Sequence, residues 1–204
     1  MLNTQEAARL EKFMVPFHGP IREAILEGFR NRLTRYSGEL LNHAARTRAC
    51  IINDLIVVEF KKKPLKSLGI KIIKRHGRIL FNIQGQVLLH FKKLDEFLQS
   101  SNLQTEFAKD FIRQFDLPGI PPTLPRLIAG YIPAPDWTGI LSAHITYPKG
   151  EEIVWSYSLI DKPTTIINQE ENTNAERIPK RRFRARGGGE GGEDDAQRTA
   201  GGQH

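Results

Sequence analysis

Apolar residues recur at helical spacing in the first third of the chain. Over residues 20–36 they come every three or four positions, which places them on one face of a helix. A shorter helix is predicted over residues 4–14, and it should end before Pro16 because proline removes a backbone hydrogen-bond donor. Residues 40–60 are rich in β-branched side chains, but apolar and polar residues come there in pairs, which favours a third helix.

Six later segments have the apolar pattern of β-strands, in two groups of three. They are residues 70–75, 78–83, 86–92, 127–132, 140–147 and 153–159. In the first group the connections are two residues long with glycine second, which is typical of β-hairpins. A helix is predicted between the groups, over residues 101–115. This order predicts an α+β fold with N-terminal helices, two three-stranded antiparallel meanders separated by a helix, and a disordered C-terminal tail.

The composition changes after Ile160. Residues 161–204 contain few large apolar side chains, and a basic block is followed there by a block of glycine and acidic residues. Such a segment buries too little apolar surface to offset the entropy lost on ordering. We therefore predict a single α+β domain over residues 1–160 and a disordered tail over residues 161–204.

The basic charge is concentrated in one segment of the predicted domain. The chain of 204 residues carries 30 Lys and Arg against 23 Asp and Glu, a formal charge of +7. The tail contains eight basic and eight acidic residues, so the whole excess lies in residues 1–160. Residues 61–78 hold eight basic residues and no acid. The candidate nucleic-acid-binding residues are Lys61, Lys62, Lys63, Lys66, Lys74, Arg75 and Arg78, with Arg181, Arg182 and Arg184 from the tail.

This basic segment has two interpretations. Lysine and arginine side chains neutralise phosphates, and each contact steepens the salt dependence of binding. Lysines on a solvated loop and an edge strand also discourage aggregation between sheets, without any ligand. The leading hypothesis is a non-enzymatic, intracellular binding or regulatory protein that contacts nucleic acid through this basic loop and hairpin. The alternative is a protein-interaction adaptor that does not bind nucleic acid and whose basic surface either engages an acidic partner or only keeps the protein soluble.

A third hypothesis is a metal-dependent nuclease. Glu59-Phe-Lys61, with Asp54 upstream, resembles the Glu-x-Lys half of the PD-(D/E)xK nuclease motif. In that family two acids on neighbouring strands hold magnesium, and the lysine lies beside the attacking water. Here Asp54 and Glu59 belong to one segment with a helical pattern, where their carboxylates would not converge. No catalytic residue is proposed beyond these three.

Several other classes of function are excluded or disfavoured by the sequence. A single cysteine, Cys50, excludes an internal disulfide framework and a zinc site made of several thiolates. The six histidines show no metal-binding spacing, and no phosphate-binding glycine loop is present, so no metal or cofactor is expected. The N-terminus lacks a signal-peptide core, and the longest apolar stretch, residues 49–58, is too short to span a membrane. We therefore expect a cytoplasmic protein without a membrane partner, and the oligomeric state stays open.

Overall fold

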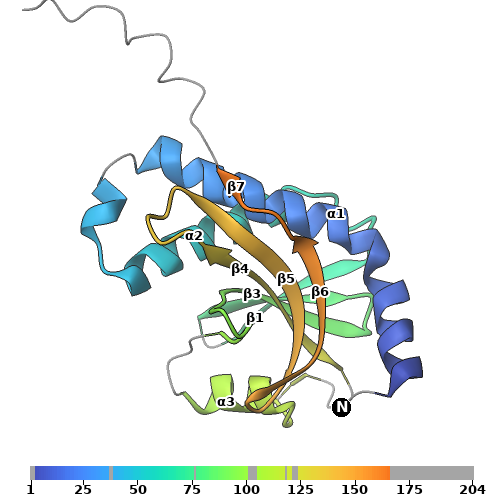
Figure 1. The fold of residues 1–204 in the computed structure, drawn as a ribbon. Coiled ribbons are helices and arrows are strands. Elements are labelled where there is room, and N and C mark those ends of the chain that lie inside the picture. The colour runs from blue at the N-terminus through green and yellow to red at the C-terminus, as the bar shows by residue number, and fades with distance from the viewer. Residues whose placement is uncertain are drawn as a thin grey trace, which may run out of the picture. The chain divides into compact units, whose positions relative to one another are not determined.

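A computed structural model describes residues 3–36, 39–75, 77–100, 105–117, 119–120 and 124–165 of the chain (Figure 1). All of these residues belong to one unit, which extends to Gln169. Residues 166–204 lie outside the described ranges. The predicted disorder of the tail and the candidate residues Arg181, Arg182 and Arg184 therefore lie outside them as well.

The described helices are α1 (Thr4–Arg35), α2 (Ala45–Lys61) and α3 (Glu106–Arg113), with a short 3₁₀ helix, η1 (Glu39–Asn42). The helix predicted over residues 40–60 is thus confirmed for most of its length. The break predicted before Pro16 is wrong, because α1 continues through both Pro16 and Pro20. Met14, Phe17 and Ile21 are buried on either side of these prolines, and this tertiary packing outweighs the lost backbone hydrogen bonds.

The strands are β1 (Ile70–Arg75), β2 (Arg78–Ile83), β3 (Val87–Lys93), β4 (Arg126–Pro133), β5 (Gly139–Lys149), β6 (Glu152–Ile160) and β7 (Thr164–Thr165). In the described part of the chain they form one sheet in the order β1-β2-β3-β4-β5-β6, and β7 pairs with β5. The α+β class is confirmed. The expectation of antiparallel pairing throughout is wrong, because β3 and β4 pair in parallel. The segment that carries α3 is a crossover connection, which returns the chain to run in the same direction.

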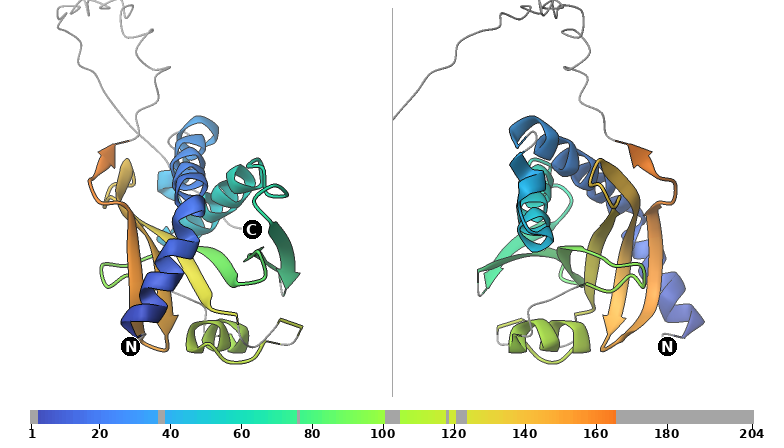
Figure 2. Two further views of the ribbon diagram at one scale, coloured as in Figure 1. Left: turned by 90° about the vertical axis from the view of Figure 1, so that its right-hand side faces the viewer. Right: turned by 60° about the vertical axis from the view of Figure 1, so that its left-hand side comes forward.

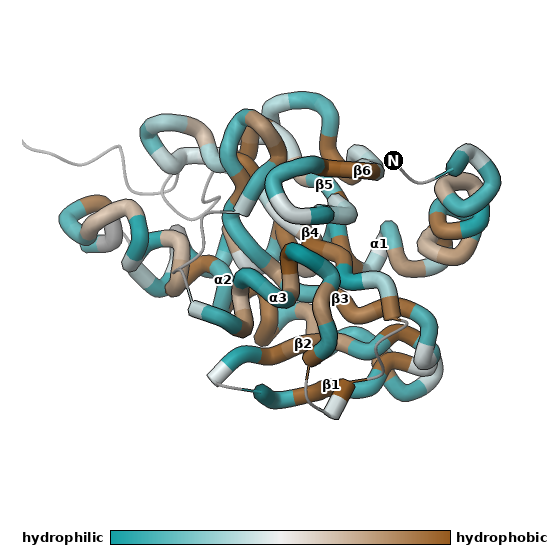
Figure 3. Tube along the Cα trace, turned by 90° about the horizontal axis from the view of Figure 1, so that it is seen from below, coloured by the Kyte–Doolittle hydropathy of each residue, from teal (hydrophilic) through white to brown (hydrophobic). Residues whose placement is uncertain are grey.

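The sheet lies between two helical layers. α1 and α2 pack on one face, and α3 packs on the other (Figures 1 and 2). The larger core lies between the α1–α2 pair and the sheet, and it includes Phe29, Phe60 and Phe91. The smaller core lies beneath α3, where Phe111 packs with Leu88 and other apolar residues. β1 forms one edge of the sheet (Figure 3). No described helix combines the length and apolar character that a membrane span requires.

Candidate nucleic-acid interface

The basic residues singled out from the sequence fall into two groups at opposite ends of β1. The loop group begins with the last residue of α2, continues into the loop after it, and consists of Lys61, Lys62, Lys63 and Lys66. The hairpin group surrounds the β1–β2 turn and consists of Lys74, Arg75 and Arg78. β1 has six residues, and a strand rises about 3.3 Å per residue, so the groups are separated by about 20 Å. The structure therefore does not gather them into one compact cluster.

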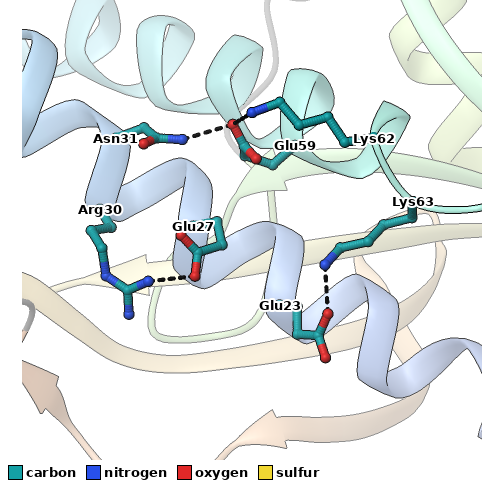
Figure 4. Close-up of polar contacts among 7 residues, drawn as sticks. All are labelled: Glu23, Glu27, Arg30, Asn31, Glu59, Lys62 and Lys63. Atoms are coloured by element: carbon teal, nitrogen blue, oxygen red, sulfur yellow. Dashed lines mark hydrogen bonds and ion pairs between the residues drawn. The ribbon is translucent and has the colours of Figure 1, made fainter.

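Two lysines of the loop group already have acidic partners (Figure 4). Lys62 Nζ lies 2.6 Å from Glu59 Oε1, which also accepts a hydrogen bond from Asn31 Nδ2 at 2.7 Å. Lys63 pairs with Glu23 on α1. Lys61 and Lys66 are exposed and have no ion pair with any described residue. These two side chains are the ones free to meet a ligand.

The loop that carries these lysines has a defined backbone. Ile70 N–H donates to the Leu65 carbonyl at 2.8 Å, and Ser67 Oγ donates to the Pro64 carbonyl at 2.9 Å. Leu65 also packs against the larger core. The loop residues surround an open hollow of about 780 Å³, lined by Lys61, Lys63, Pro64, Leu65, Lys66 and Ser67. The exposed lysines therefore extend from an ordered loop that borders a shallow, widely open hollow.

The hairpin group divides between the two faces of the sheet. Arg75 pairs with Arg78, so both side chains are on the α3 face, whereas the neighbouring Lys74 is on the other. Arg78 Nη2 donates to Thr105 Oγ1 at 3.0 Å, and its guanidinium carbon lies 4.9 Å from the centre of the Phe107 ring. Arg78 thus holds the start of α3, while Lys74 and Arg75 are exposed at the hairpin.

The three candidate catalytic residues lie on or at the end of α2 and do not converge. Asp54 and Lys61 are exposed, whereas Glu59 is buried and bound by Asn31 and Lys62. A separation of five residues places Asp54 and Glu59 about 140° apart around a helix. The described part of the chain holds no group of three or more His, Cys, Asp or Glu side chains arranged to hold a metal ion.

Sequence reasoning missed a further set of basic side chains, which lies beneath α3. His90 and Lys92 of β3 line a small cavity together with Arg78 of β2. Burial, and then the charges of Lys92 and Arg78, lower the pKa of His90 to about 3. Burial and the Arg78 charge likewise lower the pKa of Lys92. His90 and Lys92 are two residues apart on a strand and so share one face, a signal that the sequence contains, but only the fold shows that Arg78 joins them.

No family model, curated protein or solved structure matches this chain. Its function is therefore inferred from the charge, burial and contacts of its own residues. Two features stand out in the described ranges: the exposed cations along β1 and its preceding loop, and the cationic cavity beneath α3.

The buried His90 should make stability depend on pH. In the folded protein its pKa is about 3, whereas an unfolded histidine titrates near 6.5, so the unfolded chain binds more protons between these values. Its contribution is fully present above pH 6.5 and is lost as the pH falls towards 3. We expect wild type to lose up to about 1.4 kcal/mol per pH unit in this window relative to His90→Gln.

Urea unfolding of both proteins between pH 7 and pH 4 measures this difference. His43→Gln, which changes an exposed histidine, is the matched control for replacing a histidine by glutamine. Parallel pH profiles for wild type and His90→Gln would show that folding does not lower the pKa of His90.

Proposed function

We propose that the protein is a non-enzymatic binding or regulatory protein that contacts nucleic acid through a basic edge of its sheet. The basic edge comprises five exposed cations on the loop and on β1: Lys61, Lys66, Lys71, Lys74 and Arg75. The observation that carries this proposal is that none of the five forms an ion pair within the described residues.

The basic edge lies at the border of the sheet, and its length is suited to contact with several phosphates of a nucleic-acid backbone. β1 is the outermost strand of the described sheet, and no other described strand covers its outer side. The edge extends about 20 Å, and phosphates follow one another every 3.4 Å along the axis on each strand of duplex DNA, so it spans about six of them. Lys71 and Lys74 lie on opposite faces of β1, but long lysine side chains at an edge reach towards one ligand from both sides.

Charge reversal of the basic edge tests the proposal. Binding of a fluorescent DNA duplex and of a single-stranded RNA to the full chain is measured by anisotropy at increasing KCl concentration. The variant Lys61→Glu/Lys66→Glu/Lys74→Glu should bind at least 100-fold more weakly. For the duplex, its slope of log affinity against log salt should be shallower by about three, because each phosphate contact contributes about 0.9.

The matched control reverses three exposed lysines elsewhere: Lys109→Glu/Lys149→Glu/Lys162→Glu. This control has the same net charge as the basic-edge variant, so it corrects for the general loss of electrostatic attraction. Its slope of log affinity against log salt should differ from the wild-type slope by less than one. Equal losses in both variants would refute the basic edge as the binding surface. Failure of the wild-type protein to bind either nucleic acid would refute the proposal and favour an acidic protein as the partner.

A further inference from the structure

A small cavity beneath α3 collects nitrogen-bearing side chains. It is lined by Arg78, His90, Lys92, Phe107, Ala108, Phe111 and Ile128. About 10 Å³ is open to the centre of a water-sized sphere, which is room for about one water molecule or one oxygen atom. The cavity shares no cation with the basic edge, because Arg78, His90 and Lys92 belong to β2 and β3, whereas the basic edge is on β1 and the loop before it.

Strand register brings the three nitrogen groups together. His90 and Lys92 are two residues apart on β3, so their side chains leave the same face of the sheet. Continuing the register from the Phe81–Leu89 pair brings Arg78 of β2 alongside Lys92. The His90 ring meets the Phe111 ring of α3 edge-to-face, with 5.7 Å between centres. The cavity is therefore closed by α3 on one side and by the sheet on the other.

Among the residues that the structure describes, the positive charge in this cavity has no acidic partner. Lys92 forms neither an ion pair nor a hydrogen bond with any residue in the described ranges, although it is half-buried. His90 is only 6% exposed, and its imidazole likewise has no protein hydrogen-bond partner there. The internal residues outside the described ranges include no Asp or Glu. Burying like charges without a counter-charge is costly, so an anion would stabilise this site.

The start of α3 adds a further positive contribution. Thr105 caps the helix by accepting a hydrogen bond from the Ala108 N–H at 3.3 Å, and it also accepts the one from Arg78. Ala108 lies in the first turn of α3 and lines the cavity. Helix N-termini carry a partial positive charge, which favours anions.

We propose that this cavity binds the phosphoryl group of a small molecule, or free phosphate, with one oxygen inserted between Lys92, His90 and Arg78. Two cations supply charge, and neutral His90 supplies one N–H donor. The remaining phosphoryl oxygens would stay at the mouth, because the interior holds only about one oxygen atom. This site does not depend on the basic edge, so it stands whether or not the edge binds nucleic acid.

Thermal unfolding of the full chain with added inorganic phosphate, AMP or adenosine tests this site at constant ionic strength and pH 7.5. Phosphate, AMP or both should raise the Tm of wild type, and a response to AMP alone would identify a phosphate monoester as the ligand. Adenosine, which lacks the phosphoryl group, should leave Tm unchanged. Lys92→Met should lose the response, with at least a tenfold increase in the dissociation constant.

Lys93→Met is the matched control, because Lys93 is the next residue on β3, is also half-buried, and leaves the opposite face. It should respond to the ligand as wild type does. Without ligand, Lys92→Met should be at least as stable as wild type, since it removes an unpaired buried cation. No change in wild-type Tm with phosphate or AMP, or an equal response in Lys92→Met, would overturn the proposal.

Discussion

Alanine at Gly28 is expected to destabilise the protein by about 3 kcal/mol, at the upper end of the cost of overpacking a core. Gly28 is buried where α1 crosses α2. A Cβ placed there would lie 2.6 Å from the backbone N and Cα of Ile56 and from its Cγ1. Backbone atoms cannot rotate away, so the two helices would have to separate along their contact.

The control for this substitution is Gly19→Ala on the same helix. A Cβ at Gly19 meets nothing within 4 Å beyond its chain neighbours. Pro20 disfavours the helical conformation for a larger residue before it, which offsets the gain in helix propensity, so alanine there should change stability by no more than about 1 kcal/mol. Urea unfolding followed by circular dichroism measures both variants. A loss at Gly28 no larger than that at Gly19 would contradict the close crossing of α1 and α2.

The α1–α2 crossing also affects the position of the loop group of lysines. Glu23 and Asn31 of α1 lie on either side of Gly28 along the helix and contact Lys63 and Glu59, respectively (Figure 4). These contacts connect α1 to the end of α2 and to the loop that follows it. The orientation of the loop group therefore depends on how closely the two helices approach.

Local sequence patterns predicted where helices occur more accurately than where they begin and end. The paired apolar residues of α2 were sufficient to identify a helix despite its β-branched content. The continuous α1 could not be predicted from the same rules, because Pro16 and Pro20 are helix breakers unless burial compensates. That burial comes from the sheet, whose strands are 50 or more residues further along the chain.

Pairing across the sheet was harder to predict than the strands themselves. The predicted two-residue turn at residues 84–85 would pair Ile83 with Gln86, whereas the structure pairs Ile83 with Val87 across a longer turn. A shift of one residue in the pairing turns every side chain of one strand to the opposite face of the sheet. It decides whether Arg78 lies beside Phe91 or Lys92, and the cavity beneath α3 depends on that register.

The candidate site was only partly predictable for a similar reason. The density of lysines in residues 61–78 is visible in the sequence, and the Glu59–Lys62 pair has ordinary helical spacing. The Lys63–Glu23 pair joins residues 40 positions apart, so local spacing could not indicate it. β1 separates the two basic groups because of the path that the chain takes through the fold. A count of charged residues gives no information about that path.

Truncation of Phe60 to alanine is the second large effect expected, with a loss of about 4 kcal/mol in the free energy of unfolding. Phe60 is fully buried at the end of α2 and contacts Phe81 and Phe91 edge-to-face, with ring centres 4.8 and 5.1 Å away. Its carbonyl accepts the Lys63 N–H at 3.1 Å. The aromatic cluster therefore anchors the start of the basic loop on β2 and β3.

Val58→Ala on the same helix is the control, because Val58 is 41% exposed and should change stability by no more than about 0.5 kcal/mol. Phe60→Leu retains most of the buried volume and should cost less than half as much as Phe60→Ala. Urea unfolding gives all three values, and DNA binding at 10 °C reports on the loop. If Phe60→Ala costs no more than Val58→Ala, then α2 does not pack on β2 and β3 through this ring. If Phe60→Leu folds but binds DNA more weakly than Val58→Ala, the anchoring of the loop by Phe60 contributes directly to the basic edge.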